Sequence, residues 1–397
     1  MQTYKTSFPF DARKKEEILT FFKRQRDAGH RSRLASFSDQ LPVPETLYAC
    51  ILTLPEVSIR RGKAACNASV GEMVHKVLSV CGLWYIFPER KEVSPMIIDT
   101  LKEKIKGRGI RIVFTEGWDA RVQEAATKLA AEDVIRPVLL GEKEEIEATA
   151  KENGFDLTGI ETMNPAEYPD IDKMAVKMVE LRRGKLDIER CRKALMSTNY
   201  FGTMLVQMGY ADGLLGGATY STADTVRPAL QLVKAAPGNA LVSSAFLLLK
   251  GDEEYMMGDC SINLNPNADD LVEITLQTAK TARQFGIEPK IALLSYSSFG
   301  SAKGECVAKV AEAALRLHRM PIDFAVDGEM QFDTAVAPEV AKLKAPKSEV
   351  AGQANTFIFP NLSSGNIGYK IAARLGGWEA IGPVLQGLNA PINDLSR

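Results

Sequence analysis

Histidine and paired cysteines are scarce in this sequence, which excludes several kinds of site. The chain of 397 residues contains 3 histidines and 6 cysteines, and no CxxC pair occurs. Few residues are therefore available to form zinc sites, His-based metal sites or Ser-His-Asp triads. The scattered cysteines are typical of free thiols in a reducing compartment, so we expect no metal site and a cytoplasmic location.

Long apolar runs and an excess of charge of one sign are also absent. The longest apolar stretch, VLSVCGLWYIF at residues 77–87, is far shorter than the roughly 20 residues that a membrane helix needs. The first residues lack the apolar core of a signal peptide. The formal net charge of -1 indicates neither a nucleic-acid nor a membrane partner. The composition, 45% hydrophobic and 25% charged, is typical of a globular protein with room for several domains.

The organisation of the chain changes near residue 95. Residues 1–95 show no sustained alternation of strand and helix patterns, so we predict an N-terminal extension, with a genuine appendage as the alternative. From Met96, the stretch MIIDTLKEKIKGRGIRIVFTEG predicts an amphipathic helix, a Gly-marked turn and a β-branched strand in succession. We therefore expect the part from Met96 onward to fold without residues 1–95.

Strand candidates alternate with helical patterns in the rest of the chain. The strands are expected at residues 110–114, 136–140, 213–217, 240–249, 291–295, 323–327 and 356–360. Apolar strands without strict alternation, separated by amphipathic helices, indicate a mainly parallel sheet that is covered on both faces. The predicted fold class is α/β.

The junction IALLSYSSFGSAKGE leads from a buried strand into a helix near Glu305. In an open α/β sheet, ligands bind at the carboxyl ends of strands, and the free N–H groups of the next helix attract anions. We expect a phosphate cradle here, with an ordinary Ser/Gly turn as the alternative. It is not a P-loop, because GxxxxGK[ST] is absent. The candidate phosphate ligands are Ser295, Ser297, Gly300, Ser301 and Lys303.

A second junction, GGATYSTADTVRPALQLVK, has the same character. A Gly-rich strand end leads through Ser221 and Thr222 to a helix that we expect Asp224 to cap, with Pro228 in its first turn. Arg227 then either binds an anion near the strand end or pairs with Asp224 on a solvated helix face. No GxGxxG occurs, so a dinucleotide-binding fold has little support.

Other segments carry polar clusters as well. ELRRGKLDIERC places Arg182 in a basic turn between two helices, which suits either the phosphates of a nucleotide-like ligand or a solvated loop. LSSGNIGYK supplies Asn366 at another strand-to-helix junction. In DGEMQFD, the acids Asp327, Glu329 and Asp333 could bind a metal or move protons, although capping and turn roles are favoured.

Taken together, these segments resemble the phosphate acetyltransferase (phosphotransacetylase) family, from about Met96 to Arg397. The matching motifs, in the family's order, are RIVFTEGWDARVQEAA, ELRRGK, STADTVRPALQLVK, LLSYSSFGSAKGE, DGEMQFDTA, ANTFIFPNLSSGNIGYKIAARL and GPVLQGLNAPINDLSR. The resemblance implies an isocitrate/isopropylmalate-dehydrogenase-like fold with a cleft between two α/β domains. Domain I would comprise residues 96–237 plus 380–397, and the inserted domain II residues 238–379.

The resemblance also implies a reaction and its residues. Acetyl phosphate and coenzyme A would react reversibly to give acetyl-CoA and phosphate. The enzyme would be a homodimer that uses no metal, no cofactor and no covalent intermediate, and coenzyme A would be a substrate. Ser396 and Arg397 resemble the catalytic Ser-Arg pair, and Arg182 and Arg227 the arginines that help bind coenzyme A. Thr115 stands where the family usually has Pro. In the family, the LSR motif is followed a few residues later by an Asp that is taken to deprotonate the coenzyme A thiol. The sequence as given does not include that Asp, so we expect it to bind coenzyme A but to transfer acetyl groups slowly.

Three alternatives stay open at this stage. Nothing in the sequence fixes the size of the acyl pocket, so a butyryl phosphate transferase of the same family is one. A decarboxylating hydroxyacid dehydrogenase of the shared fold is another, and it would need NAD(P) and a divalent metal. The third is a catalytically impaired chain that acts only as a binding or structural module.

Overall fold

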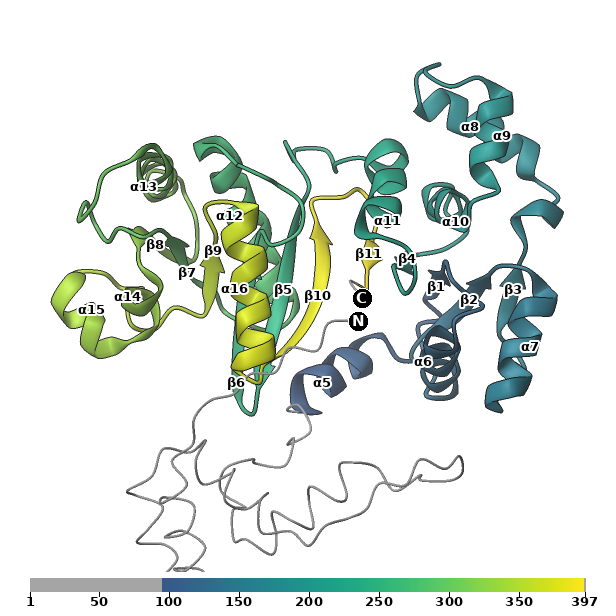
Figure 1. The fold of residues 1–397 in the computed structure, drawn as a ribbon, viewed down its shortest axis with the longest axis horizontal. Coiled ribbons are helices and arrows are strands. Elements are labelled where there is room, and N and C mark those ends of the chain that lie inside the picture. Colours follow the sequence, from purple (N-terminus) through teal and green to yellow (C-terminus); the bar gives the residue numbers. More distant parts are fainter. Residues whose placement is uncertain (1–94, 396–397) are drawn as a thin grey trace, which may run out of the picture. The chain divides into compact units, whose positions relative to one another are not determined.

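The structure, a computed structural model, describes residues 95–395. The predicted extension, apart from residue 95, and the predicted catalytic pair Ser396 and Arg397 lie outside the described residues. The described part contains two β-sheets with helices packed on their faces (Figure 1). Among its helices, none is both long and apolar enough to cross a membrane.

The first sheet has five strands in the order β11-β4-β1-β2-β3, and all neighbouring strands are parallel. Its strands are β1 (Arg111–Phe114), β2 (Arg136–Leu140), β3 (Glu161–Met163), β4 (Gly213–Gly216) and β11 (Ile392–Asp394). Successive side chains of a strand point to opposite faces. Val113 of β1 accordingly packs into one core cluster and Phe114 into another, so this sheet is buried on both faces.

Helices cover both faces of the first sheet. The cluster around Val113 includes side chains of α8 (Ile171–Leu181), α9 (Ile188–Leu195), α10 (Thr198–Gln207) and the π-helical turn η2 (Ala229–Val233). The cluster around Phe114 includes α6 (Ala120–Ala131) and α7 (Lys143–Asn153). A short 3-10 turn, η1 (Pro165–Glu167), precedes α8, and α11 (Thr222–Pro228) follows β4.

The second sheet has six strands in the order β10-β5-β6-β9-β7-β8. Its strands are β5 (Ser243–Lys250), β6 (Glu253–Gly258), β7 (Lys290–Leu294), β8 (Ala325–Met330), β9 (Thr356–Ile358) and β10 (Glu379–Gln386). The pairs β10–β5 and β5–β6 are antiparallel, and the other pairs are parallel.

Helices cover both faces of the second sheet too. On one face, α16 (Leu362–Leu375) lies along the strands (Figure 1), and its Tyr369 stacks on Phe246 of β5 with ring centroids 3.9 Å apart. The shorter helices α14 (Phe332–Val336) and α15 (Pro338–Lys344) follow β8. The opposite face is packed by α12 (Ala268–Gln284), α13 (Glu305–His318) and α5 (Pro95–Ile105).

The predicted α/β class with mainly parallel sheets is confirmed, and every predicted strand is present within a few residues. Two elements lie elsewhere than the predicted domain limits imply. Strand β10, assigned to domain I from residue 380, pairs with β5 and so belongs to the second sheet. Helix α5, also assigned to domain I, packs Ile97 into the cluster that contains Leu247 and Leu249 of β5. The division into two domains otherwise stays a prediction.

Candidate active site

A polar pocket of about 660 Å³ brings together the segments that follow β4 and β9. Hydroxyl groups and one side-chain amide dominate its lining, and Lys370 is the one cation among the described lining residues. Of the predicted site residues, Ser221, Thr222 and Asn366 are here. The complete lining is Tyr220, Ser221, Thr222, Ser261, Leu362, Ser363, Asn366, Ile367, Tyr369 and Lys370.

The first wall of the pocket is the start of α11. Ser221 is the N-cap: its Oγ accepts from the Asp224 backbone N–H at 3.2 Å and donates to the Asp224 carboxylate at 2.6 Å. The expectation that Asp224 itself caps this helix is therefore wrong. Pro228 is the last residue of α11 and not part of its first turn, because the helix begins at Thr222 and continues into the π-helical turn.

A buried carboxylate holds the loop in front of this wall. Glu116, which follows β1 and is 0% exposed, accepts backbone N–H groups from Gly217 at 3.0 Å, Thr219 at 2.7 Å and Tyr220 at 2.9 Å. The hydroxyl of Thr115 donates to the same carboxylate at 2.9 Å. Sequence reasoning missed Glu116, although an acid directly after a buried strand, at the sheet edge where parallel strands end together, was a usable signal.

A second buried carboxylate lies at the other end of the loop. Asp394, at the end of β11, is 2% exposed and accepts the Thr222 hydroxyl at 2.8 Å. The next residue, Leu395, donates its backbone N–H to Gly216 at 2.8 Å. Gly217 adopts a φ of 91°, and a Cβ there would collide with the Asp394 carboxylate. Only glycine fits this position, for both backbone and steric reasons.

The second wall of the pocket is the start of α16. Asn361 caps the helix by accepting the Ser364 backbone N–H at 3.0 Å, and the Asn366 amide donates to the Cys260 carbonyl at 3.2 Å. Asp259, 2% exposed, accepts the backbone N–H of Ser261 at 3.0 Å and so places that residue at the pocket. Burial raises the pKa of the Cys260 thiol well above its usual value, so this thiol stays protonated and is a poor nucleophile.

The predicted phosphate cradle after β7 does not line this pocket. Its loop is built around Glu329, which is 4% exposed and accepts the Gly300 backbone N–H at 2.7 Å and the Ser297 hydroxyl at 2.9 Å. The Ser301 hydroxyl accepts a neighbouring backbone N–H, and Lys303 is exposed. Two of the predicted donors, Ser297 and Gly300, therefore bind an internal acid. A substrate-binding role for Ser295, Ser297, Gly300, Ser301 and Lys303 stays a prediction, since none of them lines the pocket.

The two predicted coenzyme A arginines lie outside this pocket. Arg182 lines a smaller cavity of about 300 Å³ together with Arg183, Lys185 and Lys234, and its Nε is buried without a hydrogen-bond partner among the described residues. Arg227 is 56% exposed and pairs with Asp224 at 3.4 Å, as the alternative interpretation predicted.

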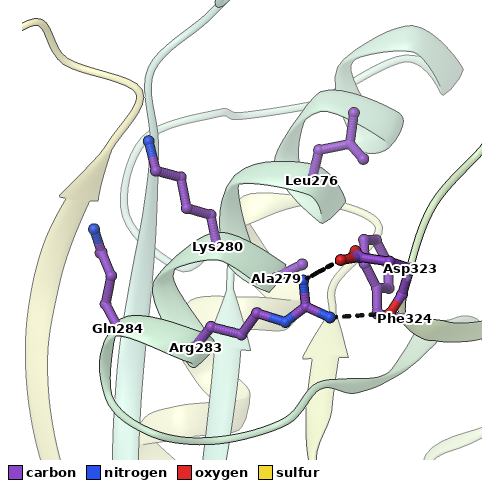
Figure 2. Close-up of a pocket in the computed structure, with 7 residues that line it drawn as sticks. All are labelled: Leu276, Ala279, Lys280, Arg283, Gln284, Asp323 and Phe324. Atoms are coloured by element: carbon purple, nitrogen blue, oxygen red, sulfur yellow. Dashed lines mark hydrogen bonds and ion pairs between the residues drawn. The ribbon is translucent and has the colours of Figure 1, made fainter.

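Figure 2 shows a third pocket, of about 420 Å³, on α12 beside the segment that leads into β8. Its Arg283 is bound to Asp323 at 2.9 Å and to Glu288 at 2.8 Å, so its charge is already neutralised. Lys280 and Gln284 extend along one side of it (Figure 2). Lys280 and Gln284 are the other polar side chains of this lining, whereas six hydroxyl-bearing residues, Asn366 and Lys370 line the pocket at α11 and α16, which is therefore the better candidate. Within residues 95–395, no group of three or more His, Cys, Asp and Glu side chains is placed to hold a metal ion.

Comparison with known proteins identifies the relatives of this chain. The family model described as "Phosphate acetyl/butaryl transferase" matches residues 96–397. The phosphate acetyltransferase of Bacillus subtilis is 49% identical over 301 residues, which cover 76% of this chain and 93% of that protein. The solved phosphotransacetylase of Streptococcus pyogenes is 51% identical, with a TM-score of 0.73 and coverage of 76% and 93%. That of Staphylococcus aureus is 46% identical, with a TM-score of 0.71 and coverage of 77% and 94%. The chain therefore belongs to the phosphate acetyl/butaryl transferase family.

Proposed function

We propose that this chain transfers an acetyl group reversibly between acetyl phosphate and coenzyme A, in the pocket between the starts of α11 and α16. Membership of the family supports the reaction, and the lining of the pocket supports its location. Several hydroxyl-bearing residues, Asn366 and Lys370 line the same space. Neutral polar side chains around Lys370 suit an acyl phosphate, which carries its charge on the phosphoryl oxygens.

The transfer itself is direct, in a ternary complex. The thiolate of coenzyme A attacks the acetyl carbon, the new S–C bond forms, and the C–O bond to phosphate breaks, so that phosphate leaves with the electron pair. A base takes the thiol proton. Cys260, which directly precedes the lining residue Ser261, is buried with a raised pKa, which supports a route without an acyl-cysteine intermediate.

Charge develops on the carbonyl oxygen and on the leaving phosphate during this step. Donors that are already in place stabilise such charge without reorganisation. We assign that role to Ser396, on the carbonyl oxygen, and to Arg397, on the phosphoryl oxygens, from the motif that they share with the family. The N-terminus of α16, a helix of 14 residues, adds a favourable dipole for the phosphate.

Coenzyme A would extend from this pocket to basic side chains. Arg182, in its cavity with Arg183, Lys185 and Lys234, and Arg227 on α11 are the proposed partners of the coenzyme A phosphates. Further proposals accompany this function: a two-domain isocitrate/isopropylmalate-dehydrogenase-like arrangement with a cleft, a homodimer in the cytoplasm, and no metal or cofactor.

The test is acetyl-CoA formation from acetyl phosphate and coenzyme A, followed in parallel with butyryl phosphate. We expect acetyl phosphate to be the better substrate and chelators to have no effect. A higher kcat/KM for butyryl phosphate would move the assignment to butyryl transfer. Coenzyme A binding without turnover would favour a binding module, and reduction of NAD(P) with a divalent metal would favour a dehydrogenase.

A further inference from the structure

We propose that Glu116 is a positioning residue for this pocket: it fixes the loop at residues 217–220 and thereby sets the wall formed by Tyr220, Ser221 and Thr222. The inference rests on the proposed function, since it concerns the same pocket. Glu116 is not among the residues that line the pocket. It acts from behind the loop, at the end of β1.

The geometry around Glu116 uses both carboxylate oxygens. Oε1 accepts the backbone N–H groups of Thr219 and Tyr220 at 2.7 and 2.9 Å, and Oε2 accepts that of Gly217 at 3.0 Å together with the Thr115 hydroxyl at 2.9 Å. The side chain is 0% exposed. A buried carboxylate is costly to desolvate unless such donors surround it, and each of these hydrogen bonds is charge-assisted.

The loop amides consequently point inward. Because Glu116 takes the N–H groups of Gly217, Thr219 and Tyr220, they are not available to an incoming phosphate. The wall instead presents side chains. The Tyr220 hydroxyl is 3.0 Å from that of Thr198, and its ring meets Trp118 edge-on with centroids 6.2 Å apart. The orientation of this wall thus depends on the loop behind it.

The two ends of the loop are also held by contacts that do not involve Glu116. At its start, Gly216 accepts the Leu395 backbone N–H, and after its end the Thr222 hydroxyl binds Asp394. Loss of Glu116 should therefore loosen residues 217–220 while the contact between Leu395 and Gly216 stays closed. This selectivity distinguishes a positioning role from general unfolding.

The experiment compares Glu116→Gln, Thr115→Val and a control, Asn267→Ala. The glutamine keeps the size of Glu116 but turns an amide donor toward backbone donors. Thr115→Val removes one donor to the carboxylate and keeps the shape of the side chain, so it carries the test if the glutamine variant does not fold. Asn267 caps α12 by accepting the Asp270 N–H at 3.0 Å and is not among the pocket's lining residues, so its loss destabilises the helix without removing a pocket side chain or a contact of Glu116.

Two readouts are needed. In hydrogen exchange, Glu116→Gln should lower the protection of the amides at 217–220 by about tenfold or more, while the Leu395 amide keeps its protection. In the acetyl-CoA assay, Glu116→Gln should raise the KM for acetyl phosphate about tenfold, and Thr115→Val should raise it less. Asn267→Ala should leave this KM unchanged at a fall in Tm similar to that of Glu116→Gln. The exchange readout does not depend on turnover, so it stands even if wild type forms no acetyl-CoA, which would instead refute the proposed function.

The positioning role is overturned if the amides at 217–220 stay protected in Glu116→Gln. It is also overturned if the amides open and both Glu116→Gln and Thr115→Val keep a wild-type KM and kcat in an active enzyme. In that case Glu116 only stabilises the fold.

Discussion

Replacing Arg227 by glutamine tests whether Arg227 binds a phosphate of coenzyme A or only pairs with Asp224 on the helix surface. In the structure Arg227 is 56% exposed and meets Asp224 at 3.4 Å, with Asp224 itself 48% exposed. A surface pair at this helical spacing is worth about 0.2 to 0.5 kcal/mol, so breaking it changes an equilibrium by less than roughly threefold. A hydrogen bond to a charged phosphate is worth about 1.5 to 3 kcal/mol, which corresponds to one to two orders of magnitude in affinity.

We therefore expect Arg227→Gln to raise the KM for coenzyme A by about ten- to a hundredfold, since the ligand contact outweighs the pair that it replaces. The matched control is Arg190→Gln, because Arg190 pairs with Asp187 at the same 3.4 Å and the same spacing, with both side chains exposed. The control should leave the KM unchanged. If both variants keep the wild-type KM for coenzyme A, Arg227 only pairs with Asp224 and its assignment to the ligand is wrong.

Other variants test the cation of the pocket, the core beside the second sheet and the ionised carboxylate of Asp119. Lys370→Met should raise the KM for acetyl phosphate about tenfold, because it removes the pocket's described cation; an unchanged KM would place the phosphate elsewhere. Ile97→Ala should lower the free energy of unfolding in urea by about 2 to 4 kcal/mol, because Ile97 is buried beside Leu247; a wild-type midpoint would show that α5 does not contribute to that core. The hydrogen bond from Arg121 holds the pKa of Asp119 below its ordinary value, so ionised Asp119 stabilises the fold above pH about 4 and loses that effect as the pH falls further. The Tm difference between wild type and Asp119→Asn should accordingly shrink below about pH 4, and a difference that is constant with pH would contradict this.

Much of the fold was predictable because buried parallel strands have a clear pattern. Of the four described strands that were not predicted, β10 is apolar but is interrupted by Gly382 and Pro383, and the other three lack the pattern. β6 begins with two acids, Glu253 and Glu254, and follows β5 after only Gly251 and Asp252, so its side of the hairpin does not look apolar. A Gly-Asp pair after an apolar run is nevertheless a hairpin signal that could have identified it. β3 and β11 are three residues long, too short for periodicity to detect.

The candidate site was predictable only in part, because residue type does not reveal which groups already have partners. Ser221, Thr222 and Asn366 were expected from Ser/Gly/Asn junctions, and the structure brings them to one pocket. The junction after β7 has the same composition, yet Glu329 accepts two of its donors, the Ser297 hydroxyl and the Gly300 backbone N–H. Such an internal acid comes from a different strand, so only the sheet order shows which loop it reaches.

The position of β11 has a consequence for how the protein folds. This strand follows β10 of the second sheet along the chain (Figure 1), yet it pairs with β4 of the first, and its Asp394 meets Thr222 across a separation of 172 residues. Contacts of such high sequence separation form slowly, because the intervening loop must first be closed. During synthesis, the first sheet cannot gain this edge strand until the whole second sheet has been made. We therefore expect the wall of the pocket at Thr222 to be completed late, after the hydrophobic cores of both sheets have formed.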